Sequence, residues 1–286
     1  MNNIKSAMSE QEFDRQTESI DRHAFRRRRV FRRIALIVLL CVVTTAVVWG
    51  AVYGCTRIVQ HRQEVLAERT FLLLRDAKLA GRVEADGTVY TDIVTDMIGF
   101  SLENYDTVIV KLTQLDDDKI NTFKKAFPKA RRVVFEDGQF VRVVTRITSD
   151  DILAKNVSTV TKLAAPTGGS FVIGNTSHHY IYELNDYYYL EQRIDGEWYN
   201  LPAVPPIPLP KGAMSPAVTD EYKPPKEPTV IAPGQSFDLT IGWYSRYGNL
   251  PTGEYRMIKV LTVKTDKEKD ETYQATYTIA VEFEIK

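Results

Sequence analysis

The chain has 286 residues, of which 44% are hydrophobic and 26% charged, as expected of a protein that folds over most of its length. Its formal net charge is zero, but residues 1–33 hold nine Lys or Arg against five Asp or Glu, so the remainder is mildly acidic. This balance disfavours nucleic-acid binding, which needs a basic face. Cys41 and Cys55 are the two cysteines, so the sequence after them excludes a disulfide framework, a thiolate metal site and a cysteine nucleophile.

Residues 1–33 are predicted to form a basic cytoplasmic tail, whose first 20 residues are polar and expected to be disordered. The tail ends in a collar of arginines, namely Arg26, Arg27, Arg28, Arg29, Arg32 and Arg33. Such a run can also mark nuclear localisation or nucleic-acid binding. Its position directly before an apolar segment favours a topogenic role. Because basic residues stay on the cytoplasmic side, the N-terminus is expected inside and the C-terminal domains outside.

Residues 34–56 are an apolar run of 23 residues without a charged side chain. About 20 apolar residues in a helix cross the hydrocarbon core of a bilayer, so the run predicts a transmembrane helix. A buried helix of a soluble protein is the alternative, but such helices rarely run this long without a polar face. Trp49 and Tyr53 lie near the outer end, where amphipathic rings favour the membrane interface.

A second interpretation of the same segment is a cleaved signal that leaves a lipoprotein anchored at Cys55. Val52-Tyr53-Gly54-Cys55 resembles a bacterial lipoprotein box, in which cleavage before the cysteine precedes its lipidation. Tyr53 is a poor match to that pattern, and the apolar run exceeds the 7–15 residues of a usual signal. Both interpretations tether the protein to membrane lipid.

Residues 57–81 contain no proline and reach their first glycine at Gly81, so they predict a helical stalk that continues the membrane helix or packs on the next domain. Three consecutive leucines, Leu72, Leu73 and Leu74, favour partial packing.

Residues 82–154 predict a small α/β unit. Residues 106–112 form a β-branched strand, and Asp116 caps a helix that Pro128 ends. Residues 131–137 form a second strand, and the order strand, helix, strand permits a parallel crossover. Asp137-Gly138 is expected to be a hairpin turn leading to a third strand over 139–147.

Residues 155–286 predict a β-sandwich with a proline-rich insertion at 202–233, which holds ten of the 13 prolines. Apolar and polar residues alternate strictly from Tyr277 to Ile285, so one face of this strand is buried. The same alternation runs from Phe237 to Trp243. Asp195-Gly196 predicts a tight hairpin between two further strands.

Two motifs of this region resemble a bacterial immunoglobulin-like domain family that is common in exported proteins of Gram-positive bacteria. The first is YLEQRIDGEWYNLP at 189–202, and the second begins at Pro233-Gly234 and runs through YGNLPTGEYRMIK at 247–259. The resemblance covers about 110 of the 286 residues, and residues 1–150 resemble no family. It implies an immunoglobulin-like sandwich and an exported location, but no catalytic residues and no agreed ligand. The fold class is therefore predicted as α+β, with the membrane helix and stalk, the α/β unit and the all-β sandwich in chain order.

Several residues of the two motifs have structural roles that follow from elementary physics. Glycines supply turn conformations, and the two tryptophans are expected to fill the sandwich core. Tyr255 should point inward on its strand, as should Met257. The structural residues assigned in this way are Gly196, Trp198, Trp243, Gly248, Pro251, Gly253 and Tyr255.

The run HHYIYELNDYYYL at 178–190 is unusually aromatic and offers a possible interaction surface. Exposed tyrosines are common at recognition surfaces, so this surface is assigned to Tyr180, Tyr182, Tyr187 and Tyr188. The alternative is that alternate tyrosines fill the core. The proline-rich insertion offers a polyproline ligand, at Pro205-Pro206-Ile207-Pro208, or a stiff loop.

No catalytic, metal or cofactor residue is assigned. His178 and His179 are neighbours that point to opposite faces if they lie in a strand, and Asp116-Asp117-Asp118 fits a helix N-terminus. No phosphate-binding loop, nucleophile elbow or HExxH pair occurs.

The leading hypothesis is a membrane-anchored, extracytoplasmic, non-enzymatic protein whose immunoglobulin-like domain binds a protein or cell-envelope partner. A single-pass signalling or regulatory subunit with a partner for its basic tail is the second hypothesis. An enzyme with a carboxylate site in the α/β unit is the third.

Overall fold

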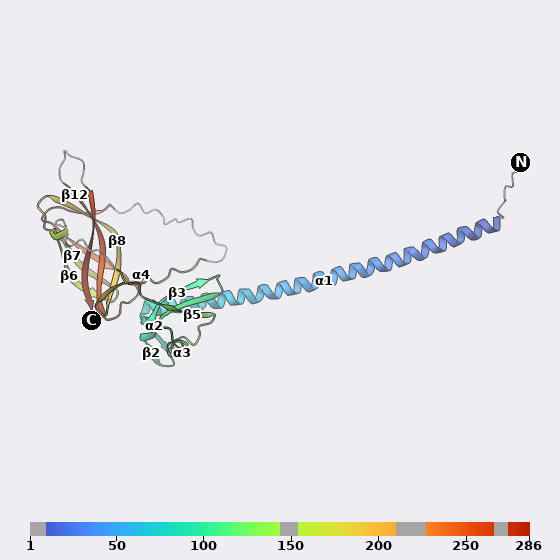
Figure 1. The fold of residues 1–286 in the computed structure, drawn as a ribbon, viewed down its shortest axis with the longest axis horizontal. Helices are drawn as coiled ribbons and strands as arrows, with labels where there is room; N and C mark the ends of the chain where they lie inside the picture. The colour runs from blue at the N-terminus through green and yellow to red at the C-terminus, as the bar shows by residue number, and fades with distance from the viewer. Residues whose placement is uncertain (1–9, 144–153, 210–226, 266–273) are drawn as a thin grey trace. The chain divides into compact units, whose positions relative to one another are not determined.

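A computed structural model describes residues 10–143, 154–209, 227–265 and 274–286, and describes side chains from Phe31 onward. The chain divides into two units, residues 1–62 and residues 63–286. Each is described separately, and Figure 1 labels several of the elements.

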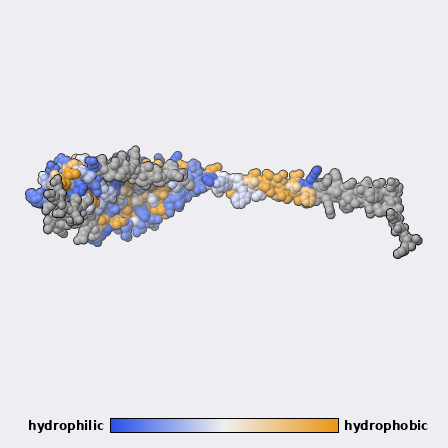
Figure 2. Space-filling model, turned by 90° about the horizontal axis from the view of Figure 1, so that it is seen from above, coloured by the Kyte–Doolittle hydropathy of each residue, from blue (hydrophilic) through white to orange (hydrophobic). Residues whose placement is uncertain are grey.

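The first unit consists of the N-terminal part of α1, a helix that spans Glu10–Ala80. It contains one stretch that is long and apolar enough to cross a membrane. The apolar side chains of this stretch are exposed, including Leu36 at 66% and Trp49 at 72%, and they form the hydrophobic band in Figure 2. The helix begins at Glu10, so the prediction of disorder is wrong for residues 10–20. These residues lack Gly and Pro, and they extend a helix that is already nucleated.

In the second unit, the end of α1 belongs to the core of the α/β unit instead of forming a separate stalk. Ala67, Phe71, Leu74 and Ala77 recur on one face of the helix and are buried. They pack with buried residues of the following strands and helices. Of the two arrangements expected for residues 57–81, a continuing stalk or packing on the next domain, the structure shows packing, because the apolar face of the helix supplies part of the domain core.

The α/β unit contains a parallel crossover, as its strand, helix, strand order permits. β4 pairs with β5 in parallel and with β3 antiparallel, while α3 connects β4 to β5. The Asp116 carboxylate accepts a hydrogen bond from the Lys119 amide at 2.7 Å, which confirms the predicted helix cap. The elements are β1 (Val83–Ala85), β2 (Thr88–Tyr90), α2 (Asp92–Asp96), β3 (Met97–Glu103), β4 (Thr107–Thr113), α3 (Asp117–Ala126) and β5 (Val133–Gly138).

The hairpin predicted at Asp137-Gly138 is wrong, because both residues belong to β5 and pair with β4. Asp137 also accepts a hydrogen bond from the Leu115 amide at 3.1 Å. A Cβ on Gly138 would lie 3.0 Å from the Cβ of Lys111, so glycine here permits close strand packing. Of the third strand predicted over 139–147, residues 139–143 contribute a single bridge, from Arg142 to Tyr199. Residues 144–147 lie outside the described residues.

The C-terminal region is a sandwich of two antiparallel sheets, which confirms the predicted fold class. One sheet has the order β10-β8-β12-β13, with β9 also on β8, and the other has the order β11-β7-β6. The elements are η2 (Ala154–Asn156), β6 (Val157–Ala165), β7 (Gly168–Asn175), β8 (Tyr180–Ile194), β9 (Glu197–Asn200), β10 (Thr229–Ile231), β11 (Ser236–Gly242), α4 (Tyr244–Tyr247), β12 (Gly253–Thr265) and β13 (Gln274–Ile285).

The core of the sandwich is centred on an aromatic stack. Phe283 stacks on Trp243 at 5.1 Å and on Tyr255 at 5.7 Å between ring centroids. The Trp243 indole donates to the Pro166 carbonyl at 2.8 Å, and the Tyr255 hydroxyl donates to the Pro251 carbonyl at 2.8 Å. Both buried polar groups are thereby satisfied. The alternating residues from Tyr277 to Ile285 are all buried, as their pattern predicts.

Trp198 does not fill the core, contrary to expectation. It lies half-buried on the outer face of the larger sheet, with the Arg256 guanidinium 4.4 Å from its ring centroid. On the edge strand β9, Trp198 pairs with Arg193 of β8, and this register places its side chain on the face of the sheet that carries Arg193, away from the sandwich interior. The proline-rich insertion also contains a strand, β10, which pairs with β8. Residues 210–226 of the insertion lie outside the described residues.

Candidate functional site

β8 carries a bulge between the segment that pairs with β10 and the segment that pairs with β9. On one edge, β8 pairs with β10 through residues 182–184 and with β9 through residues 191–194. On the other edge, Leu184 pairs with Leu261 and Tyr188 pairs with Lys259. Residues 185–187 are therefore extra residues on β8 facing a single residue of β12. A bulge of this kind redirects side chains away from the regular alternation.

Lys259 stabilises the bulge from inside. Its side chain is on the inward-facing series of β12 with Tyr255 and Met257, and the residue is 2% exposed. The Nζ atom donates to the Asn185 carbonyl at 2.7 Å and approaches the Tyr187 carbonyl at 3.5 Å. Burial lowers the pKa of Lys259, and the Asp186 carboxylate partly opposes this shift. The ammonium group thus supplies a donor to the backbone of the irregular segment.

The bulge presents tyrosines around Arg246, a residue of α4. The Arg246 guanidinium lies 5.6, 6.0 and 5.4 Å from the ring centroids of Tyr187, Tyr188 and Tyr247. It donates to the Tyr188 carbonyl at 2.9 Å, while the ring of Tyr189 lies 6.4 Å from that of Tyr187. We call Tyr187, Tyr188, Tyr189, Arg246 and Tyr247 the tyrosine–arginine cluster.

The cluster differs from the surface expected from the sequence. Tyr187 is 56% exposed and Tyr188 is half-buried, whereas Tyr182 is fully buried in the sandwich core. Tyr182 is therefore wrong as a surface residue, because its place in the alternation of β8 points inward. Tyr180 is half-buried and packs against the second core cluster of the sandwich, away from Arg246. Sequence reasoning missed Arg246 and Tyr247. These residues lie almost 60 positions after the tyrosine run, and no sequence spacing links the two segments.

A hollow of about 380 Å³ adjoins the cluster and is lined in part by Tyr187, Tyr189, Asn200, Arg246 and Tyr247. Burial raises the pKa values of Tyr188 and Tyr247, so both phenols stay neutral at physiological pH. Aromatic faces, a guanidinium and an amide are groups that bind a partner through stacking and hydrogen bonds. Within the described residues, no three His, Cys, Asp or Glu side chains lie close enough to hold a metal ion.

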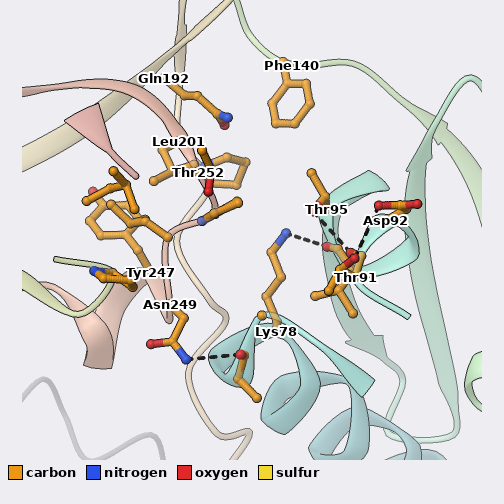
Figure 3. A pocket seen from close by; sticks show the side chains of 18 of the residues that line it. Lys78, Thr91, Asp92, Thr95, Phe140, Gln192, Leu201, Tyr247, Asn249 and Thr252 are labelled. Atoms are coloured by element: carbon orange, nitrogen blue, oxygen red, sulfur yellow. Dashed lines mark hydrogen bonds between the residues drawn. The ribbon is translucent and has the colours of Figure 1, made fainter. Parts of the chain in front are cut away.

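A second, larger cavity of about 620 Å³ lies between the end of α1, α2 and the loop that follows α4 (Figure 3). Lys78 donates from Nζ to the Val94 carbonyl at 3.0 Å and to the Met97 carbonyl at 2.7 Å. Burial lowers the pKa of Lys78 to about 8, and the nearby Asp96 carboxylate partly offsets the shift. Within the α/β unit, these hydrogen bonds join the end of α1 to α2 and to the first residue of β3.

Two ion pairs connect β8 and β12 on the outer face of the sheet. Arg256 and Glu191 are direct cross-strand neighbours, with the Nε and Oε2 atoms 2.5 Å apart and side-chain exposures of 7% and 0%. The second pair, Arg193 and Glu254, is 3.0 Å apart with exposures of 45% and 59%. Trp198 adjoins both arginines, with the Arg193 guanidinium 5.9 Å from its ring centroid. Arg256 is therefore enclosed by a carboxylate and an indole.

The remaining motif residues shape turns and close contacts. Asp195 and Gly196 have φ values of +50° and +85° and form the hairpin between β8 and β9. Gly248 has a φ of +77°, and a Cβ there would lie 2.6 Å from the Lys78 carbonyl oxygen. Gly253 begins β12. His178 and His179 are exposed between β7 and β8, with ring centroids 6.3 Å apart.

Comparison with known proteins identifies the sandwich. Residues 154–284 match the family model described as the bacterial Ig-like domain, in agreement with the resemblance carried by the motifs. No curated protein and no solved structure gives a significant match to the chain. The β-rich region at residues 154–284 is therefore a bacterial Ig-like domain, and it follows a long helix with one apolar stretch able to cross a membrane.

Proposed function

We propose that the protein is anchored in a membrane by the apolar part of α1 and presents its Ig-like domain outside the cytoplasm as a non-enzymatic interaction domain. One observation carries the proposal: the 23 uncharged residues at 34–56 form an exposed helix that leads into a folded unit. A soluble protein rarely exposes a continuous apolar surface of this extent, because its contact with water is unfavourable. The arginine collar supports a cytoplasmic N-terminus.

The orientation is tested by labelling single cysteines in intact cells. Cys41 and Cys55 are replaced by serine, and either the exposed Ser236 of β11 or Ser19 of the tail becomes the sole cysteine. A membrane-impermeant maleimide should label Ser236→Cys in intact cells, and Ser19→Cys after lysis alone. Labelling of Ser19→Cys in intact cells, or protection of Ser236→Cys, would refute the proposed topology.

The interaction role is assigned to the tyrosine–arginine cluster, and its partner is expected to be a protein or another component of the cell envelope. Tyrosine and arginine supply large contact areas and directional hydrogen bonds at interfaces. Tyr187 is the most exposed member that can be probed without disturbing the core.

A photoreactive phenylalanine analogue at position 187 tests this assignment in the full-length protein in cells. The matched control carries the same analogue at Tyr105, which is 38% exposed on the α/β unit. Irradiation should give a discrete cross-linked product from position 187 and none from position 105. Equal cross-linking at both positions, or none at position 187, would remove the cluster as the binding face.

A signalling or regulatory subunit is a second candidate, favoured by the start of α1 at Glu10. Residues 10–33 of the basic tail thereby belong to the same helix, α1, whose last turn contacts Asn249 of the Ig-like domain. Deleting residues 2–20 distinguishes the two functions. Loss of the cellular phenotype with normal labelling of Ser236→Cys would favour signalling, whereas an unchanged phenotype would favour a role confined to the outer domains.

A further inference from the structure

The end of α1 is capped by a loop of the Ig-like domain. The last carbonyls of a helix have no partner within the helix, so they need donors from elsewhere. The Asn249 amide donates to the Leu79 carbonyl at 2.9 Å, and the Asn249 side chain donates to the Ala80 carbonyl at 3.1 Å. Figure 3 shows the Asn249 side chain meeting the end of the helix. These contacts join residues 169 or more positions apart in the sequence.

Gly248 permits this approach in two ways. Its φ of +77° is a conformation that side-chain-bearing residues adopt at a cost. In addition, a Cβ at this position would lie 2.6 Å from the Lys78 carbonyl oxygen and 2.8 Å from the Leu79 Cα. Both obstacles are backbone atoms, so a larger residue would push the loop and the helix apart.

The joint around this cap is hollow, and the cavity there is lined by both polar and apolar residues. Among the described residues, the core cluster of the α/β unit shares no side chain with either cluster of the sandwich. The cavity of about 620 Å³ adjoins the cap, and a further contact is a hydrogen bond of 3.3 Å from Arg75 to the Pro205 carbonyl. Domain interfaces with little shared apolar surface are those at which relative motion is expected.

We propose that the loop Tyr247-Gly248-Asn249 is a reversible latch that engages and releases the last turn of α1 while both domains remain folded. Each domain keeps its own core when the latch opens, and opening breaks the two hydrogen bonds from Asn249 to the last residues of α1. Opening is therefore a local event with a lower free energy than global unfolding. The inference does not depend on what the Ig-like domain binds.

Hydrogen exchange in the full-length protein in detergent micelles tests the latch. The Asn249 amide should exchange faster than the amides of the β12–β13 ladder in the wild-type protein. Gly248→Ala should accelerate exchange at Asn249 by about tenfold or more, the expected effect of losing one or two hydrogen bonds, and should leave the ladder unchanged. Gly234→Ala is the matched control, because Gly234 has a φ of +73° but nothing within 4 Å of its added Cβ.

Three results would overturn the proposal. The first is a wild-type Asn249 amide that exchanges with the ladder in a single global event. The second is unchanged exchange in Gly248→Ala, and the third is an equal effect of Gly234→Ala at Asn249.

A cysteine pair provides a second test that does not require Gly248→Ala to fold. A Cβ on residue 81 would lie 3.5 Å from the Asn249 Cβ, within the range of a disulfide. In a background lacking Cys41 and Cys55, Gly81→Cys with Asn249→Cys should oxidise to an intramolecular disulfide and slow exchange at residue 249. Failure of the folded pair to oxidise, or a disulfide that leaves exchange at residue 249 unchanged, would reject the latch.

Discussion

Replacing Glu191 with glutamine should destabilise the Ig-like domain strongly, although the substitution keeps the size of the side chain. Glu191 is fully buried, and it faces an Arg256 side chain that is 7% exposed. The substitution leaves a buried guanidinium without its counter-charge. Removing one partner of a buried pair lowers the free energy of unfolding by about 3–5 kcal/mol. For a domain of this size, about 2–4 °C per kcal/mol then predicts a fall in Tm of roughly 6–20 °C.

The neighbouring pair provides the control, because Arg193 and Glu254 join the same two strands on the same face. Their side chains are 45% and 59% exposed, so Glu254→Gln should lower the free energy of unfolding by less than about 1 kcal/mol. Scanning calorimetry of the full-length protein in detergent measures both variants. The double variant Glu191→Leu with Arg256→Met should recover most of the loss, because it removes both charges. Equal Tm values for Glu191→Gln and Glu254→Gln would refute the reasoning from burial.

Three further predictions concern single residues. Burial lowers the pKa of Lys78 from 10.5 to about 8, so between these pH values Lys78 is protonated in the unfolded chain and largely deprotonated in the folded protein. The free energy of unfolding should therefore rise across this window by up to about 3 kcal/mol, and chemical denaturation of Lys78→Met should show a flatter pH profile. Lys259→Met should speed hydrogen exchange around Asn185, because the carbonyl of this residue loses its donor, and should lower the free energy of unfolding by about 1 kcal/mol. Unchanged exchange would contradict the assigned role. Intact mass should show the uncleaved 32.6 kDa chain in both wild type and Cys55→Ser; a lipidated product beginning at Cys55 would support the lipoprotein interpretation instead.

The sequence contains three Asp-Gly pairs, which show where local signals suffice for prediction. Asp86-Gly87 and Asp195-Gly196 have positive φ values and turn hairpins, between β1 and β2 and between β8 and β9. Asp137-Gly138 lies inside a parallel strand, because pairing with β4 extends to Gly138 and outweighs the turn preference. Alternation in β13 predicts its buried face for a different reason: β13 pairs with β12 from Gly253 to Lys264 without a register shift, so the regular pleat is kept along the strand.

The candidate site was less predictable because it depends on contacts between distant segments. The aromatic run pointed to Tyr187 and Tyr188, but it could not separate them from Tyr182, since the bulge that changes the alternation depends on Lys259 of another strand. Arg246 is brought to the tyrosines by α4, a single turn without a distinctive sequence signal. Likewise, the sequence does not reveal why residue 248 is glycine, because the reason is the close approach of the backbone at Lys78, a distant segment.

Tyr247 borders both hollows: the one beside the tyrosine–arginine cluster and the one beside the end of α1. It also immediately precedes the glycine on which the capping loop depends. A molecule that prefers the cluster in one arrangement of this loop would therefore change the population in which the helix end is capped. Linkage is reciprocal, so the factor by which the molecule shifts the capping equilibrium is the factor by which capping of the helix end changes the affinity of the cluster for the molecule. One aromatic ring would in this way make the helix end and the tyrosine–arginine cluster sensitive to each other.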